Sequence, residues 1–157
     1  MVVNLLIIFI IQFYILFILN KLAYKFDFLD YPNKRKIHSK PTPYLGGLSL
    51  SITYFFLIYL LKNEYLFFKS ILLCAILISA VGLIDDKVDM NPASKLILQT
   101  IPVIILISQG LYLTDIGVYE LFGKINLGYY GKIFTFLSCL LIINAFNYVD
   151  GVDGLLP

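Results

Sequence analysis

LFFKSILLCAILISAVGLI, residues 66–84, is followed at once by DDKVD, residues 85–89. The first stretch carries a single charge, Lys69, and is long enough for a helix to cross about 30 Å of hydrocarbon. The acidic residues that follow cannot enter hydrocarbon without a large cost in free energy. We therefore expect a transmembrane helix that ends at Ile84 and delivers carboxylates to one membrane face.

The rest of the chain has the composition of a membrane protein. Of its 157 residues 60% are hydrophobic and 14% charged, and the mean hydropathy of +0.88 excludes an ordinary water-soluble domain. A net charge of +2 gives no concentrated basic surface, so we expect no nucleic-acid partner. The apolar pattern predicts an all-α polytopic fold, a single membrane domain over 1–157 with about five transmembrane helices, at 2–19, 45–61, 66–84, 95–113 and 131–148.

Two connections have features of their own. The first apolar run lacks a basic leading region and a small-residue cleavage site, so we interpret it as a retained span rather than a signal peptide. Between the fourth and fifth helices, residues 114–130 alternate polar and apolar positions and contain three glycines, which predicts a small hairpin or an irregular loop.

The lysines and arginines of the short loops predict the orientation, because cytoplasmic loops contain an excess of them. The loops after the first and third helices together carry eight: Lys21, Lys25, Lys34, Arg35, Lys36, Lys40, Lys87 and Lys95. The opposite side carries four: Lys62, Lys69, Lys124 and Lys132. The N-terminus is therefore expected outside, the 114–130 hairpin extracytoplasmic, and the segment after the fifth helix cytoplasmic.

The first polar cluster lies in the loop after the first helix. Residues 30–43 read DYPNKRKIHSKPTP, with three prolines that favour extended or turn geometry and with basic residues that suit an anionic partner. The chain's single histidine, His38, also lies in this loop. An ordinary basic loop attracted to anionic lipid headgroups is the alternative.

The second cluster is Asp85, Asp86 and Asp89, at the end of the third helix. Carboxylates there repel one another and face the negative end of the helix dipole, so the arrangement calls for a compensating cation, which we predict to be a divalent metal. Further along, Asn91 and Pro92 form a helix start, and Lys95 in the first turn completes a candidate phosphate cradle. The simpler interpretation is that the acids only mark the membrane boundary.

The third cluster ends the fifth helix. Asn144, Asn147, Asp150 and Asp153 recur every third residue, so they form one polar ridge while helical geometry lasts. Polar groups in a membrane helix are costly unless they face a partner, a cavity or a ligand. A ladder of hydrogen bonds between helices is the alternative, and it explains the asparagines better than the aspartates.

Together these clusters resemble the polyprenyl-phosphate N-acetylhexosamine-1-phosphate transferases of glycosyltransferase family 4. The residues that carry the resemblance are Asp30-x-Pro32-Asn33-x-Arg35-Lys36-x-His38-x-x-Pro41-x-Pro43-x-x-Gly46-Gly47, Gly82-x-x-Asp85-Asp86-x-x-Asp89 with Lys95 and Gln99, and Asn144-x-x-Asn147-x-x-Asp150-Gly151-x-Asp153-Gly154-Leu155. The first of these is more similar to enzymes that use UDP-N-acetylglucosamine than to the peptidoglycan branch.

The resemblance implies an activity and its setting. The undecaprenyl phosphate attacks the β-phosphorus of a UDP-N-acetylhexosamine, with Mg²⁺ or alternatively Mn²⁺ as cofactor, and UMP is released. The reaction belongs to cell-wall or surface-polysaccharide synthesis at the cytoplasmic face of the bacterial inner membrane. Phosphoryl transfer depends on charge neutralisation and positioning, so carboxylates with a metal and basic residues are the expected groups.

The resemblance also implies roles for individual residues. Asp85 and Asp86 are the candidate catalytic residues and, with Asp150, the candidate metal ligands. The remaining candidates bind substrate: Lys36, His38, Lys40, Lys95, Asn147, Asp150 and Asp153.

One departure from the family affects the expected activity. Family members are longer and carry two later motifs, a Gly-Asp segment and a histidine-containing loop, so we expect this chain to be a truncated form with little or no activity alone. The competing hypotheses are a non-enzymatic membrane fragment and an ion-coupled transport subunit. A transporter would place its carboxylates near the middle of the membrane rather than at helix ends.

Overall fold

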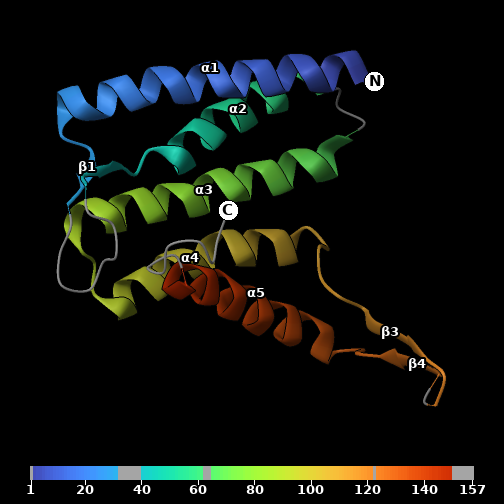
Figure 1. The fold of residues 1–157 in the computed structure, drawn as a ribbon. Helices are drawn as coiled ribbons and strands as arrows, with labels where there is room; N and C mark the ends of the chain where they lie inside the picture. The colour runs from blue at the N-terminus through green and yellow to red at the C-terminus, as the bar shows by residue number, and fades with distance from the viewer. Residues whose placement is uncertain (1, 32–39, 62–64, 122, 150–157) are drawn as a thin grey trace.

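The computed structural model describes residues 2–31, 40–61, 65–121 and 123–149, and within them side chains from Leu6 to Tyr148. This part of the chain forms five helices and two short antiparallel sheets (Figure 1). The helices are α1 Val2–Phe26, α2 Gly46–Leu60, α3 Leu66–Val88, α4 Pro92–Ser108 and α5 Tyr130–Val149. The strands are β1 Leu29–Asp30, β2 Thr42–Pro43, β3 Asp115–Tyr119 and β4 Gly123–Asn126.

Each helix expected from the apolar pattern has a counterpart, but several ends differ. The first helix was expected to end at residue 19 and instead runs on to Phe26, past Lys21 and Lys25. The ammonium groups of these two lysines lie over the rings of Phe17 and Phe26, 4.4 and 5.7 Å from the ring centroids. A helix can therefore continue through charged residues beyond its apolar run when the aliphatic parts of their side chains pack along the helix.

The other differences lie at the ends of α3 and α4. Helix α3 continues one turn past Ile84 to Val88, so the acids expected just after the helix lie in its last turn and cap. Helix α4 was expected over 95–113 but ends at Ser108, because Gly110 takes a positive φ of 85° that breaks helical geometry.

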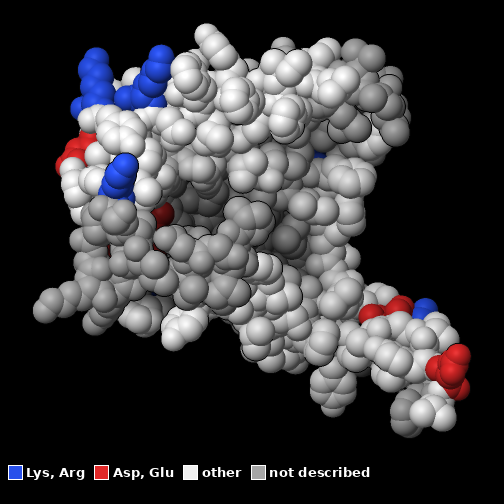
Figure 2. Space-filling view, in the orientation of Figure 1, with Lys and Arg blue, Asp and Glu red and all other residues white. Residues whose placement is uncertain are grey.

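In the described part of the chain, three segments are long and apolar enough to cross a membrane: Leu6–Phe26, Leu66–Val88 and Tyr130–Tyr148. Helices α2 and α4 are apolar but shorter, at 15 and 17 residues, or about 22 and 26 Å of rise. On the face drawn in Figure 2 charged side chains gather at the two ends of the molecule, and the belt between them is almost uncharged. The fold is that of a polytopic membrane protein.

The helices pack in the order in which they occur in the chain. Contacts join α1 to α2, α2 to α3, α3 to α4 and α4 to α5. Polar groups also join the first pair: Gln12 of α1 donates to the Ser49 hydroxyl at 2.9 Å and accepts from Thr53, both on α2. Hydrogen bonds of this kind hold helices together in a membrane, where there is no hydrophobic driving force for helices to associate.

The two sheets connect helices at opposite ends of the bundle. Strand β1 pairs with β2, Leu29 opposite Pro43, and this brings the ends of the basic loop together beside α2. Strands β3 and β4 form the hairpin expected within residues 114–130. The end of α1, the start of α2, the α3–α4 junction and the end of α5 all lie at the β1–β2 end (Figure 1).

Candidate active site

The junction between α3 and α4 is a tight, well-capped turn. Asp89 ends α3 in the left-handed conformation, φ 52° and ψ 67°, and its N–H donates to the carbonyl of Asp85 at 2.8 Å. Asn91 then caps α4, its side-chain oxygen accepting from the Ser94 N–H at 2.8 Å, and Pro92 takes the first helical position. The predicted helix start at Asn91 and Pro92 is confirmed. The turn places the last residues of α3 beside the first residues of α4.

Three polar side chains from three helices meet beside this turn. The Lys95 Nζ lies 2.6 Å from Asp85 Oδ2 and also donates to Asn147 Oδ1 at 2.6 Å. The Lys95 and Asp85 side chains are only 12% and 18% exposed. We call Asp85, Lys95 and Asn147 the charged cluster.

The helix dipoles explain why Asp85 and Lys95 pair. Asp85 lies in the last turn of α3, where the dipole disfavours a negative charge, and Lys95 lies in the first turn of α4, where it disfavours a positive one. Each charge is unfavourable alone, and each offsets the other. At least part of the compensation that Asp85 requires therefore comes from Lys95 rather than from a metal.

A second polar contact joins α4 and α5 one turn further into the bundle. Asn144 donates from Nδ2 to Gln99 Oε1 at 2.8 Å and to the carbonyl of Leu140 at 2.8 Å. Gln99 is only 3% exposed. The polar ridge expected for α5 is therefore directed at α4. Two successive hydrogen bonds, Asn144 to Gln99 and Lys95 to Asn147, fix the register of the two helices.

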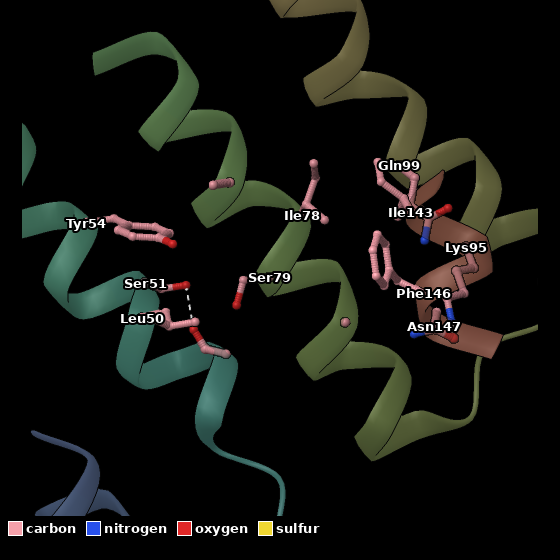
Figure 3. Close-up of a pocket in the computed structure, with 13 residues that line it drawn as sticks. Leu50, Ser51, Tyr54, Ile78, Ser79, Lys95, Gln99, Ile143, Phe146 and Asn147 are labelled. Carbon is pink, nitrogen blue, oxygen red and sulfur yellow. Dashed lines mark hydrogen bonds between the residues drawn. The ribbon is translucent and has the colours of Figure 1, made fainter. Parts of the chain in front are cut away.

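Two open cavities share Lys95 and Asn147 of the charged cluster as part of their walls, and Asp85 lines one of the two. One, of about 660 Å³, contains Asp85, Asp89, Asn144 and Tyr148 as well as Lys95 and Asn147. The other, of about 560 Å³, extends between α2–α3 and α4–α5 and is mainly apolar. Figure 3 shows Lys95, Gln99, Phe146 and Asn147 on its α4–α5 side and Tyr54, Ser51 and Leu50 on its α2 side, with Ile78 and Ser79 of α3 between them.

Asp86 has a different environment from its neighbour Asp85. It is exposed and does not contribute to either cavity. Burial is the main reason why the pKa of the Tyr44 hydroxyl is raised, and the negative charge of Asp86 is the next largest cause. The two adjacent aspartates therefore have different neighbours. Asp85 pairs with Lys95 of α4 beside α5, whereas the charge of Asp86 affects Tyr44, just before α2.

Of the other predicted site residues, the structure describes some and not others. Lys36, His38, Asp150 and Asp153 lie outside the described residues, and Lys40 is exposed beside β2. Within the described ranges no group of three or more His, Cys, Asp or Glu side chains could hold a metal ion. Among the residues that line the larger cavity, Asp85, Asp89, Asn144 and Asn147 carry side-chain oxygens of the kind that a hard cation prefers.

Comparison with known proteins decides the family. The family described as "Glycosyl transferase family 4" matches residues 68–157, which is more than half of the chain and includes the charged cluster. The chain belongs to glycosyl transferase family 4. The family resemblance drawn from the three motifs is thereby confirmed.

Three relatives with the same name support the assignment of the chain to glycosyl transferase family 4. Each is an "undecaprenyl-phosphate alpha-N-acetylglucosaminyl 1-phosphate transferase". The protein from Yersinia pestis is 35% identical over 95% of this chain, that from Escherichia coli strain K12 32% over 90%, and that from Salmonella typhi 34% over 90%. The chain spans about two fifths of the length of these relatives, 41%, 39% and 39%. No solved structure matches it.

From the sequence, Asp85 was expected to bind a metal and Lys95 a phosphate, and no pairing of the two was expected. The sequence did indicate that each charge is unfavourable at its end of a helix, Asp85 at the end of α3 and Lys95 at the start of α4. The turn between the two helices brings these opposite charges together, so that each stabilises the other. The Gln99–Asn144 contact is an interhelical hydrogen bond of the kind that the ladder alternative predicted for the asparagines, although Gln99 had not been named as the partner. Among the described residues the buried hydroxyl oxygen of Ser79 has no hydrogen-bond partner, and no sequence pattern indicated this.

Proposed function

We propose that this chain supplies part of the active site of an enzyme that transfers N-acetylglucosamine-1-phosphate, or a related N-acetylhexosamine-1-phosphate, from a UDP-sugar to undecaprenyl phosphate. UMP is the second product, and the reaction takes place at the cytoplasmic face of a bacterial inner membrane. The observation that carries the proposal is the charged cluster, which combines one cation and two oxygen groups from three membrane helices. The names of the relatives supply the substrate class.

Lys95 is the candidate phosphate ligand. An ammonium group has three N–H donors, and Asp85 and Asn147 accept two of them within the described part of the chain. The third can donate to a phosphate oxygen in either adjoining cavity. Asp85 holds the ammonium in position, and Asn147 fixes it from α5. Lys36, His38 and Lys40 are proposed as further phosphate ligands from the basic loop.

A divalent metal is proposed to complete the site. Asp85, with Asp86 and Asp150 as the other proposed ligands, would hold Mg²⁺, with Mn²⁺ as the alternative. When bound, the metal supplies positive charge that neutralises the phosphate oxygens of the diphosphate. Asp153 and Asn147 are proposed to contact the nucleotide-sugar. The mainly apolar cavity between α2–α3 and α4–α5 suits the first isoprene units of the acceptor lipid.

Ion-coupled transport has less support from the same geometry. A transporter would keep an ionisable group near the middle of the bilayer, but Asp85 lies in the last turn of α3 and is paired with a lysine. We therefore develop only the transferase proposal.

A fusion enzyme tests the proposal, because this chain spans only part of its relatives. Residues 1–157 replace the matching part of the Yersinia pestis relative, and membranes with the fusion are supplied with undecaprenyl phosphate and UDP-N-acetylglucosamine labelled in the sugar. The expected result is label in the lipid fraction and release of UMP, both abolished by a chelator and restored by Mg²⁺. Unchanged transfer in the presence of the chelator would contradict the metal assignment. The intact relative is the positive control.

A further inference from the structure

The β3–β4 hairpin is an exposed projection at the end of the bundle away from the charged cluster, and it carries apolar side chains next to the charged Asp115, Glu120 and Lys124. It leaves the bundle beside α4 and α5 and points away from α1–α3 (Figure 1). Leu121 at its tip is 89% exposed, and Val118 and Ile116 of β3 are exposed as well. Apolar side chains gathered on a small projection normally meet a partner surface.

The hairpin is held in place rather than loosely tethered. The N–H of Leu113 donates to the Thr135 hydroxyl of α5 at 2.8 Å, and the N–H of Leu127 donates to the carbonyl of Thr114 at 2.9 Å. Gly131 allows the close approach, because a Cβ at this position would lie 2.3 Å from the Leu113 carbonyl oxygen. The direction in which the hairpin points is therefore set by the start of α5.

The base of the hairpin carries the residues that favour a membrane surface. Tyr129 is 99% exposed, and it lines a small open pocket of about 340 Å³ with Tyr112, Gly128 and Lys132. The Lys132 Nζ lies 5.3 Å from the centroid of the Tyr112 ring. Tyrosine and lysine at the ends of membrane helices sit at the headgroup level, where aromatic rings contact the acyl boundary and ammonium groups contact lipid phosphate.

Continuity with the helices fixes the level of the hairpin. It joins α4 to α5, and the α5 segment Tyr130–Tyr148 is long and apolar enough to cross a membrane. The hairpin therefore begins at the level where this segment leaves the hydrocarbon, which is the level of the lipid headgroups.

We propose that the β3–β4 hairpin is a membrane-surface anchor, with Val118 and Leu121 in the acyl boundary and Lys132 on the phosphate of a phospholipid. This places it in the leaflet opposite the charged cluster. The proposal is independent of the transferase reaction, because it concerns lipid contacts at the other end of the bundle.

Tryptophan fluorescence tests it directly, because the chain contains no tryptophan. Leu121→Trp and Val118→Trp are made separately in the full chain and reconstituted in vesicles of phosphatidylcholine and phosphatidylglycerol. Leu137→Trp, on an exposed position of the spanning helix α5, is the lipid-facing reference, and N-acetyltryptophanamide in buffer is the water reference.

The expected result is blue-shifted emission from both hairpin probes, with stronger quenching by lipids brominated near the headgroup than by lipids brominated near the chain end. This corresponds to a depth of about 5–10 Å. Emission like that of the water reference, with strong quenching by iodide, would overturn the proposal. So would blue-shifted emission insensitive to both iodide and brominated lipid, because the hairpin would then be covered by protein.

Discussion

Replacing Lys95 with methionine tests the charged cluster at its only described cation. The variant keeps most of the side-chain volume but leaves the Asp85 carboxylate without its ammonium partner and Asn147 Oδ1 without its donor. Breaking a buried ion pair by removing one partner costs about 3–5 kcal/mol. With side chains 12% and 18% exposed, a loss of about 2–3 kcal/mol is the appropriate estimate.

The helix dipole reduces this loss. Removing a positive charge from the first turn of α4 relieves an unfavourable interaction of under about 1 kcal/mol. The net decrease in the free energy of unfolding is then about 2 kcal/mol. Asp85→Asn should also destabilise, and the double variant should lose less than the sum of the two, since neither unpaired charge remains.

Unfolding by SDS in mixed micelles, followed by circular dichroism, measures these differences. Lys124→Met is the matched control, because Lys124 also pairs with an aspartate, Asp115, at 3.1 Å but is 55% exposed. We expect no measurable change in the global free energy of unfolding of that variant, because exposed ion pairs contribute little to it. If Lys95→Met were as neutral as Lys124→Met, or if the two charge removals were additive, the inference that Asp85 and Lys95 stabilise each other would be refuted.

Three further predictions concern the contacts around the cluster and the hairpin. Asn144→Leu leaves the Gln99 amide without its partner on α5 and should cost about 0.5–2 kcal/mol in the same unfolding assay, while a stabilised protein would contradict the inferred hydrogen bond. Gly131→Ala should cost about 1–3 kcal/mol through the contact of the new methyl group with the Leu113 carbonyl, whereas Gly46→Ala, with nothing within 4 Å, should be tolerated. The hydrogen bond from Lys124 holds the pKa of the Asp115 carboxyl below its usual range, so its stabilising contribution is present above about pH 4 and is lost as the pH falls through the lowered pKa. Hydrogen exchange in β3 and β4, corrected for its intrinsic pH dependence, should therefore accelerate in acid more in the unsubstituted chain than in the Lys124→Met variant. Equal acceleration in the two proteins would contradict this prediction.

The sequence predicted the helices well and their ends less well. Apolar runs indicate where lipid can surround a helix, but the continuation of α1 past Lys21 and of α3 past Asp85 depends on what the charged side chains contact. Phe17 stacks under Lys21, and Lys95 pairs with Asp85. Such contacts arise only when the helices pack, so a local pattern does not contain them.

The candidate site was predictable in composition and less so in its pairing. The spacing of Asn144 and Asn147 indicated a polar ridge, and the structure directs this ridge at Gln99 and Lys95. Asp85 and Asp86 have different neighbours because α3 packs between α2 and α4. Their adjacency in the sequence gives no indication of this difference.

The initial rate of sugar-phosphate transfer by the fusion enzyme carrying Asp85→Asn tests the central claim most directly. If Asp85, Lys95 and Asn147 form part of the active site, UMP release that depends on undecaprenyl phosphate should fall at least about 100-fold, the scale for loss of one group that stabilises charge in a transition state. Lys124→Met in the same fusion should leave the rate unchanged. A rate for Asp85→Asn within the error of the unsubstituted fusion would contradict the claim.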